Sequence, residues 1–128
     1  MAKRGLCTPT QSIAFDVTES DFEETVLQTS NERPVIVDFH ASWCGPCRFL
    51  APVLEEAIGA SDGQIKLAKI DVDSEGRLAQ KYKVSSIPLV LAFHKGEVVD
   101  KFSGLHDQTF VDNFVSKLAA LNKRSSTE

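Results

Sequence analysis

The chain has 128 residues, of which 42% are hydrophobic and 25% are charged, as expected of one globular domain with a hydrophobic core. Its formal net charge of −4 excludes a general electrostatic attraction to nucleic acid or to an anionic membrane surface. The longest apolar run, residues 87–93, is far shorter than the roughly 20 residues that a transmembrane helix requires.

The two ends of the chain are polar. Residues 1–12 contain two basic residues and no acid, and they lack the apolar segment of a secretory signal. We expect them to form a disordered leader, and its origin as a transit-peptide remnant stays open. The folded domain is predicted over residues 13–121, followed by a polar tail at residues 122–128.

The first half of the chain predicts two strands and two helices. Residues 13–17 predict an outer strand. Thr18 or Ser20 is suited to cap the helix that follows, and Ser20 with Glu23 fits a capping box. The stretch that begins at Val35 predicts a strand running into a helix, and its strand part is almost all apolar and β-branched, which is typical of a strand covered on both faces. The second helix carries a broad apolar stripe, which consists of Phe49, Leu50, Val53, Leu54, Ala57 and Ile58.

The second half predicts three strands and two helices. Residues 65–72 predict a strand parallel to the strand that begins at Val35, and Asp73 or Ser74 is suited to cap a short helix. Residues 94–97 predict a hairpin turn between the last two strands. Asp107 is suited to cap a final helix, whose stripe consists of Phe110, Val111, Phe114, Val115, Leu118 and Leu121. This order predicts an α/β fold with a central mixed five-stranded sheet flanked by four helices.

Two cysteines stand where the central strand runs into the second helix, in the sequence Cys44-Gly45-Pro46-Cys47. Pro46 suits the first helical turn. Because the N–H groups and dipole of the helix end stabilise a thiolate, we expect the Cys44 pKa to fall below the ordinary ~8.5. Cys44 is the candidate nucleophile at the exposed helix start, and Cys47 is the candidate resolving thiol, more deeply buried.

Other uses of this cysteine pair are a structural disulfide or half of a zinc site. Tetrahedral zinc normally needs four protein ligands, and the sequence has no second Cys or His pair at ligand spacing, so no metal site is predicted. An odd count of three cysteines with one close pair is more typical of an intracellular redox protein than of a secreted disulfide framework.

Asp38 is the one carboxylate within the apolar central strand. An unpaired carboxylate in such a strand costs several kcal/mol, so desolvation should raise its pKa. It then becomes a candidate proton acceptor or donor for Cys47 through water. The alternative is a neutral Asp38 that is hydrogen-bonded in the core.

The sequence Trp43-Cys44-Gly45-Pro46-Cys47, with Asp38-Phe39 before it and Ile87-Pro88 after it, resembles the thioredoxin family. The resemblance covers residues 13–121. Phe39-His40-Ala41 and residues 98–102 look most like the mitochondrial branch, so the expected location is the mitochondrion, with the cytoplasm as the alternative.

The resemblance implies roles for further residues. It makes Asp38 the acid–base group, with Lys69 beside it to tune its ionisation. It implies a cis peptide bond before Pro88 and pairing of an extended substrate with the backbone of Ile87. The expected rim of an apolar docking surface consists of Trp43, Gly45, Pro46, Ile87, Pro88 and Gly104. Leu89 replaces the threonine usual in the family, and Ser85 and Ser86 also depart from typical residues.

The function implied by the resemblance is a protein disulfide reductase that cycles between dithiol and disulfide. A flavin-dependent thioredoxin reductase would return electrons from NADPH, so the chain itself needs no bound cofactor. Peroxiredoxins are expected among its targets, and the chain is expected to be a monomer. Two alternatives stay open: an oxidase or isomerase of the same fold, and a non-enzymatic subunit or chaperone that binds partners through the rim.

Overall fold

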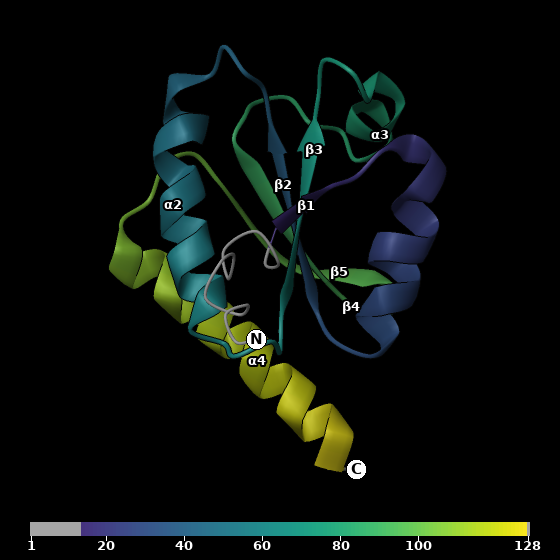
Figure 1. Ribbon diagram of the computed structural model, residues 1–128, viewed down its shortest axis with the longest axis vertical. Helices are drawn as coiled ribbons and strands as arrows, with labels where there is room; N and C mark the ends of the chain where they lie inside the picture. The colour runs from purple at the N-terminus through teal and green to yellow at the C-terminus, as the bar shows by residue number, and fades with distance from the viewer. Residues whose placement is uncertain (1–13, 128) are drawn as a thin grey trace, which may run out of the picture.

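The computed structural model describes residues 14–127, with side-chain burial described through residue 122. A five-stranded sheet in the order β1-β3-β2-β4-β5 forms its centre (Figure 1). Strand β2 is parallel to β3 and antiparallel to β4, so the predicted mixed sheet is confirmed. The strands are β1 (Ala14–Asp16), β2 (Val35–His40), β3 (Lys66–Asp71), β4 (Leu89–His94) and β5 (Glu97–Ser103).

Helices cover both faces of the sheet. Helices α2 and α4 lie together over one face. Helix α3 and the first helical segment, which consists of η1, η2 and η3 (residues 19–31), lie over the other face (Figure 1). Within residues 14–127, no helix is long and apolar enough to cross a membrane. The helical elements are η1 (Glu19–Asp21), η2 (Glu23–Gln28), η3 (Thr29–Asn31), α2 (Gly45–Gly59), α3 (Gly76–Lys81) and α4 (Gln108–Thr127).

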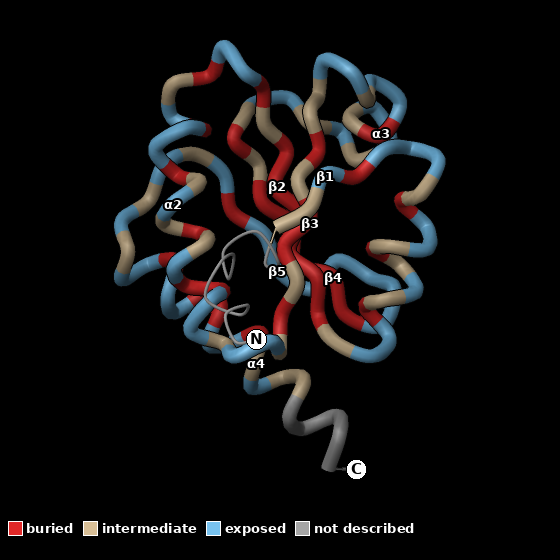
Figure 2. The backbone as a smooth tube through the Cα atoms, viewed as in Figure 1, coloured by how far each residue is buried: buried red, intermediate tan, exposed pale blue. Residues whose placement is uncertain are grey.

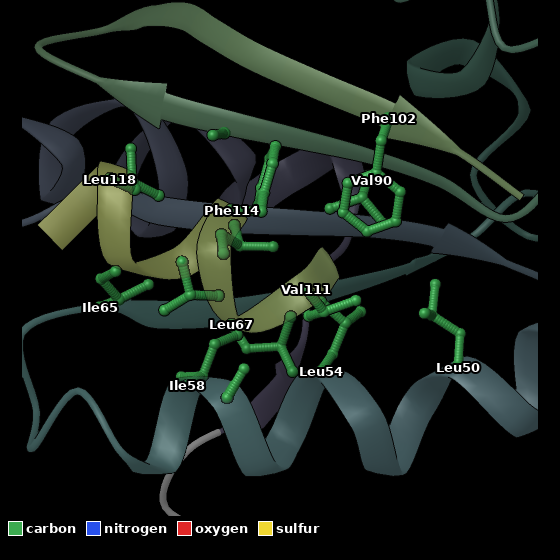
Figure 3. Packing of buried hydrophobic residues seen from close by; sticks show 14 residues of the cluster. Leu50, Leu54, Ile58, Ile65, Leu67, Val90, Phe102, Val111, Phe114 and Leu118 are labelled. Atoms are coloured by element: carbon green, nitrogen blue, oxygen red, sulfur yellow. The ribbon is translucent and has the colours of Figure 1, made fainter. Parts of the chain in front are cut away.

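Alternation along the strands divides the core into two layers, because successive strand residues point to opposite faces. On one face, Ile36 and Leu67 belong to a cluster with Leu50 and Leu54 of α2. This cluster also contains Val111, Phe114 and Leu118 of α4, as Figure 3 shows. On the other face, a second cluster joins the strands to the first helical segment and α3 through Val35, Val37, Phe39, Phe22, Val26 and Leu78. Figure 2 shows the buried strands at the centre and exposed residues on the outer turns of the helices.

The first helical segment is not a regular α-helix. It begins and ends in 3₁₀ turns, and η2 between them is a π-helix. The Thr25 hydroxyl donates to the Asp21 carbonyl at 2.6 Å, and the Thr29 hydroxyl donates to the Glu24 carbonyl, five residues back, at 3.2 Å. Such bonds from side chains to the preceding turn compete with regular i→i−4 bonding.

The capping box predicted for Ser20 and Glu23 is wrong. The helix begins two residues earlier, with Thr18 at the N-cap, and the Asp21 carboxylate accepts a hydrogen bond from the Thr18 N–H at 2.8 Å. Thr18, the other predicted cap, is therefore the residue in use. Thr18 and Asp21 therefore form the capping box of this helix, two positions before the predicted pair.

Helix α4 continues to Thr127, beyond the end predicted at Leu121. No Gly or Pro follows Leu121, so the sequence contains no strong signal to stop the helix there. Residues predicted as a polar tail thus continue the helical backbone. The predicted leader at residues 1–12 lies outside the described residues.

Phe49 does not join the buried stripe of α2 and is 69% exposed. The buried face follows Leu50, Leu54, Ala57 and Ile58, at helical spacings of three and four. Phe49 precedes Leu50 by one residue, which is about 100° around the helix. It therefore falls outside the stripe on the solvent side.

Candidate redox site

The two cysteines lie at the N-terminus of α2, just beyond the carboxyl end of β2. Cys44 is the N-cap residue, and its sulfur accepts a hydrogen bond from the Cys47 N–H at 3.2 Å. Pro46 stands in the first turn, where its missing N–H leaves no intrahelical bond unmade. A negative charge on the Cys44 sulfur would therefore face the positive end of the helix dipole.

Cys44 and Cys47 form a disulfide, with their Cα atoms 5.3 Å apart. This separation is in the usual range for a disulfide. The structure thus contains the closed disulfide of these two cysteines, a form that a redox-active pair and a structural disulfide share.

The expected difference in exposure between the two cysteines is wrong for the disulfide form, because each is 4% exposed. Both pack with Ala41 in one small buried cluster, and Val72 and Ile87 pack against it. The chain after β3 and the loop before β4 thus cover the sulfur atoms from outside their own helix. Exposure of the closed disulfide does not distinguish a nucleophile from a resolving thiol.

The predicted rim is brought together from three segments, with different degrees of exposure. Trp43 is 67% exposed. Pro46 is exposed, Gly45, Ile87 and Gly104 are half-buried, and Pro88 is buried. The Ile87–Pro88 peptide bond is cis, as the resemblance implied. The Gly104 N–H donates to the Pro88 carbonyl at 2.9 Å, which joins the end of β5 to this loop.

Asp73 is a site residue that the sequence reasoning missed. Its carboxylate accepts a hydrogen bond from the Trp43 indole N–H at 2.9 Å and so fixes the exposed ring. The sequence predicts Asp73 or Ser74 as the cap of α3, but both are wrong, because Glu75 is the N-cap residue of that helix. The available signal was its position: Asp73 follows β3, whose carboxyl end lies at the same sheet edge as that of β2.

Asp38 is fully buried, and neither of its carboxylate oxygens has a hydrogen-bond partner among the described residues. The alternative of a hydrogen-bonded core Asp38 therefore finds no support there. Burial raises the pKa of Asp38 from 3.8 to about 6, and the charge of Glu55 adds to the rise while Lys69 opposes it. Near neutral pH this carboxyl group can therefore exchange between its protonated and ionised forms.

The strand register explains how Asp38 and Lys69 meet. They are direct neighbours across β2 and β3, with side chains on the same face of the sheet. Ile36, two residues earlier in β2, packs against α2, so Asp38 faces the same helix nearer its N-terminus. The lysine implied by the resemblance is therefore beside the carboxylate, where its charge lowers the pKa of Asp38.

His40 follows Asp38 on the same face at the end of β2, next to Asp71 of β3. Its Nε2 atom is buried without a hydrogen-bond partner among the described residues. Burial is the largest cause that lowers the His40 pKa, and Lys69 acts in the same direction. The ring is therefore neutral at pH 7, which suits a packing residue.

Comparison with known proteins agrees with this geometry. The family profile described as thioredoxin matches residues 13–117. Mitochondrial thioredoxin of Bos taurus is 44% identical over 108 residues, which cover 84% of this chain and 64% of the bovine protein. Probable thioredoxin-2 of Caenorhabditis elegans is 48% identical over 107 residues, covering 83% of this chain and 72% of the relative.

A bacterial relative matches almost from end to end. Thioredoxin of Staphylococcus saprophyticus is 41% identical over 101 residues, which cover 79% of this chain and 93% of the bacterial protein. By contrast, the chain spans just under two thirds of the bovine and rat mitochondrial thioredoxins. The profile match, these identities and the cysteine site agree on one conclusion. The chain belongs to the thioredoxin family.

Proposed function

We propose that this protein is a protein disulfide reductase that cycles between the Cys44–Cys47 disulfide and the corresponding dithiol. The observation that carries the proposal is the placement of this disulfide at the N-terminus of α2, beyond the carboxyl end of a central strand. Ligand sites of open α/β sheets favour that edge. The helix end there stabilises an attacking thiolate and a thiolate leaving group.

The reaction consists of two thiol–disulfide exchanges. The Cys44 thiolate attacks one sulfur of a partner disulfide, forming a mixed disulfide and releasing the other partner sulfur as a thiolate. The Cys47 thiolate then attacks the Cys44 sulfur, closes the Cys44–Cys47 disulfide and releases the second partner thiolate. Two electrons pass to the partner, whose two thiolates take up two protons.

In this scheme Asp38 accepts the proton that Cys47 must lose before its attack, through water. Two features support the role: strand alternation places Asp38 on the sheet face that α2 covers, and its pKa of about 6 leaves it mostly ionised at pH 7. Lys69 serves as a positioning residue, since it acts through Asp38 by holding that pKa down against burial.

The proposed physiological setting follows from family membership. A flavin-dependent thioredoxin reductase returns electrons from NADPH, peroxiredoxins are among the partners reduced, and the chain works as a monomer without a bound cofactor. A mitochondrial location is supported by the resemblance to mitochondrial thioredoxins of cattle, rat and mouse.

An insulin-reduction assay with NADPH and thioredoxin reductase tests the activity. The wild-type protein should precipitate insulin and consume NADPH, whereas the Cys44→Ser variant should do neither. The Cys7→Ser variant is the matched control and should keep wild-type activity, because Cys7 lies outside the matched family region. Equal activity of the Cys44→Ser variant and the wild type would refute the reductase.

The reduction potential separates the reductase from an oxidase of the same fold. Gly45-Pro46 between the cysteines is the pair that resembles the reducing members of the family. We expect a value near the roughly −270 mV typical of thioredoxins. A value near about −120 mV, at the oxidising end of the range, would favour the oxidase instead.

A further inference from the structure

A groove of about 450 Å³ lies along β4 and β5, on the sheet face opposite α2. Leu89 and Leu91 of β4 line it, together with Lys101 of β5 and Lys83, which follows α3. It exists because β5 is the edge strand and mostly exposed, so the first helical segment and α3 do not extend over it. The groove plays no part in the dithiol chemistry described above.

The groove is continuous with the proposed docking rim. Ser86 and Ser103 line it, and they directly precede Ile87 and Gly104 of the rim. Leu89 and Ser103 are paired across β4 and β5, which places both at the end of the groove nearest the cis proline. A polypeptide that binds beside Ile87 can therefore continue into the groove without leaving the surface.

The charge of the groove differs from that of the chain. Lys83 and Lys101 are both exposed, and no residue lining the groove is acidic, although the whole chain has a net charge of −4. Asp100 is next to Lys101 in sequence but is paired with Ala92, whose side chain belongs to the α2 face. The Asp100 carboxylate accepts a hydrogen bond from the Lys101 N–H at 2.9 Å, and Asp100 is not among the residues that line the groove.

We propose that this groove binds an acidic, extended segment of the partner protein whose disulfide is reduced. This inference rests on the proposed reductase function. Lys83 and Lys101 would contact the acidic side chains, and Leu89, which replaces the usual threonine of the family, would provide an apolar contact beside them. The groove thus makes the reductase selective for disulfides flanked by acidic residues.

The strand register sets the spacing of the acidic side chain. Lys101 is level with Leu91, four residues beyond Ile87 along the chain. An extended peptide advances about 3.3 Å per residue, so an acidic side chain about four residues from the attacked cysteine reaches Lys101.

Single-turnover reduction of two synthetic peptides tests this selectivity. Each peptide carries one cysteine as a mixed disulfide with 2-thiopyridine, with Glu in one and Gln in the other, four residues on either side of the cysteine. The reduced protein should release thiopyridine from the Glu peptide about 1.5- to fivefold faster at low salt, which is the effect expected when one of its acidic side chains forms an exposed charge pair in the groove. The preference should shrink as salt screens the charges.

Substitution of Lys83 and Lys101 tests whether these two side chains cause the preference for the Glu peptide. Lys83→Gln/Lys101→Gln should reduce both peptides at one rate, whereas the control Lys95→Gln/Lys117→Gln, with the same change in net charge at exposed lysines outside the groove, should keep the wild-type preference. Equal rates for the wild type, or loss of the preference in both double variants, would overturn the inference while the reductase stands. Failure of the wild type to reduce either peptide would instead refute the reductase itself.

Discussion

Asp38 shows how an energetic penalty in the folded state accompanies a candidate catalytic group. Its carboxyl group is fully buried without a hydrogen-bond partner among the described residues, and its pKa rises to about 6. The folded state thus holds the proton more tightly than the unfolded state does. The resulting contribution to stability is complete below pH 4 and is lost as pH rises through 6.

Asp38→Asn removes the buried charge and should therefore stabilise the protein at neutral pH. From the rise of the pKa from 3.8 to about 6, the free energy of unfolding at pH 7 should increase by up to about 3 kcal/mol. The gain should disappear at pH 4 and below, where the wild-type carboxyl is neutral too. Urea denaturation of the oxidised proteins at both pH values measures this, and the exposed Glu23→Gln variant provides the control. A gain that is the same at pH 4 and pH 7 would contradict the pKa.

The same substitution tests proton transfer. If Asp38 accepts the proton of Cys47, the reductase rate of the wild type should rise between about pH 5 and pH 7, as a group with a pKa of about 6 ionises. Asp38→Asn should lack this rise and be slower at pH 7. Stopped-flow reduction of insulin across this pH range gives the two profiles. An unchanged profile in the variant would remove the acid–base role.

At the scale of residues, chemistry that depends on local sequence was predictable. Cys44, Cys47 and Asp38 were identified because their residue types stand at unusual places in an apolar strand and at a helix start. The equal burial of the cysteines was not predictable, since Ile87 reaches them from another loop. The hydrogen bond from Trp43 to Asp73 likewise depends on which strand ends meet in space.

At the scale of elements, Ser30 joins the first helical segment to the β4–β5 hairpin. This fully buried hydroxyl donates to the Leu27 carbonyl at 2.7 Å and accepts from the Gly96 N–H at 2.8 Å. The predicted hairpin turn is confirmed, with positive φ at Lys95 and Gly96. Ser30 therefore holds a tight turn against a helix end from a different part of the chain.

Ser30→Ala should destabilise the protein by about 1 kcal/mol, because the Gly96 N–H loses its acceptor. Ser116→Ala, at an exposed position of α4, should change stability by less than about 0.5 kcal/mol. Chemical denaturation of the oxidised proteins makes the comparison. If the Ser30→Ala and Ser116→Ala variants were equally stable, the hydrogen bonds of the Ser30 hydroxyl would contribute nothing to the stability of the fold.

The strands were better predicted than the helices. The strand predicted at the start of the stretch from Val35 is confirmed as β2, because a run of apolar residues can be buried on both faces of a sheet. The π-helical η2 was not predictable, because threonine hydroxyls there bond to carbonyls in place of regular helical bonding. The place of Phe49 depends on how the buried stripe of α2 is turned toward the sheet, which hydrophobicity alone does not fix.

At the scale of the whole molecule, the sheet order brings distant segments to one redox site. Strand β2 lies between β3 and β4, so Cys44 after β2 meets the chain that follows β3 and the loop that precedes β4. The alternation of strands and helices predicted this layered fold. The groove beside Pro88 was not predictable, because it arises from how far α3 and the first helical segment reach across β4 and β5.

The central claim is that Cys44 attacks the partner and Cys47 resolves the mixed disulfide, although both are equally buried in the closed disulfide. Trapping tests it most directly: single-cysteine variants, Cys47→Ser and Cys44→Ser in a Cys7→Ser background, are mixed with insulin and analysed by non-reducing mass spectrometry. The Cys47→Ser protein should accumulate a mixed disulfide through Cys44, and the Cys44→Ser protein should form almost none. A mixed disulfide that forms as readily through Cys47 would contradict the account.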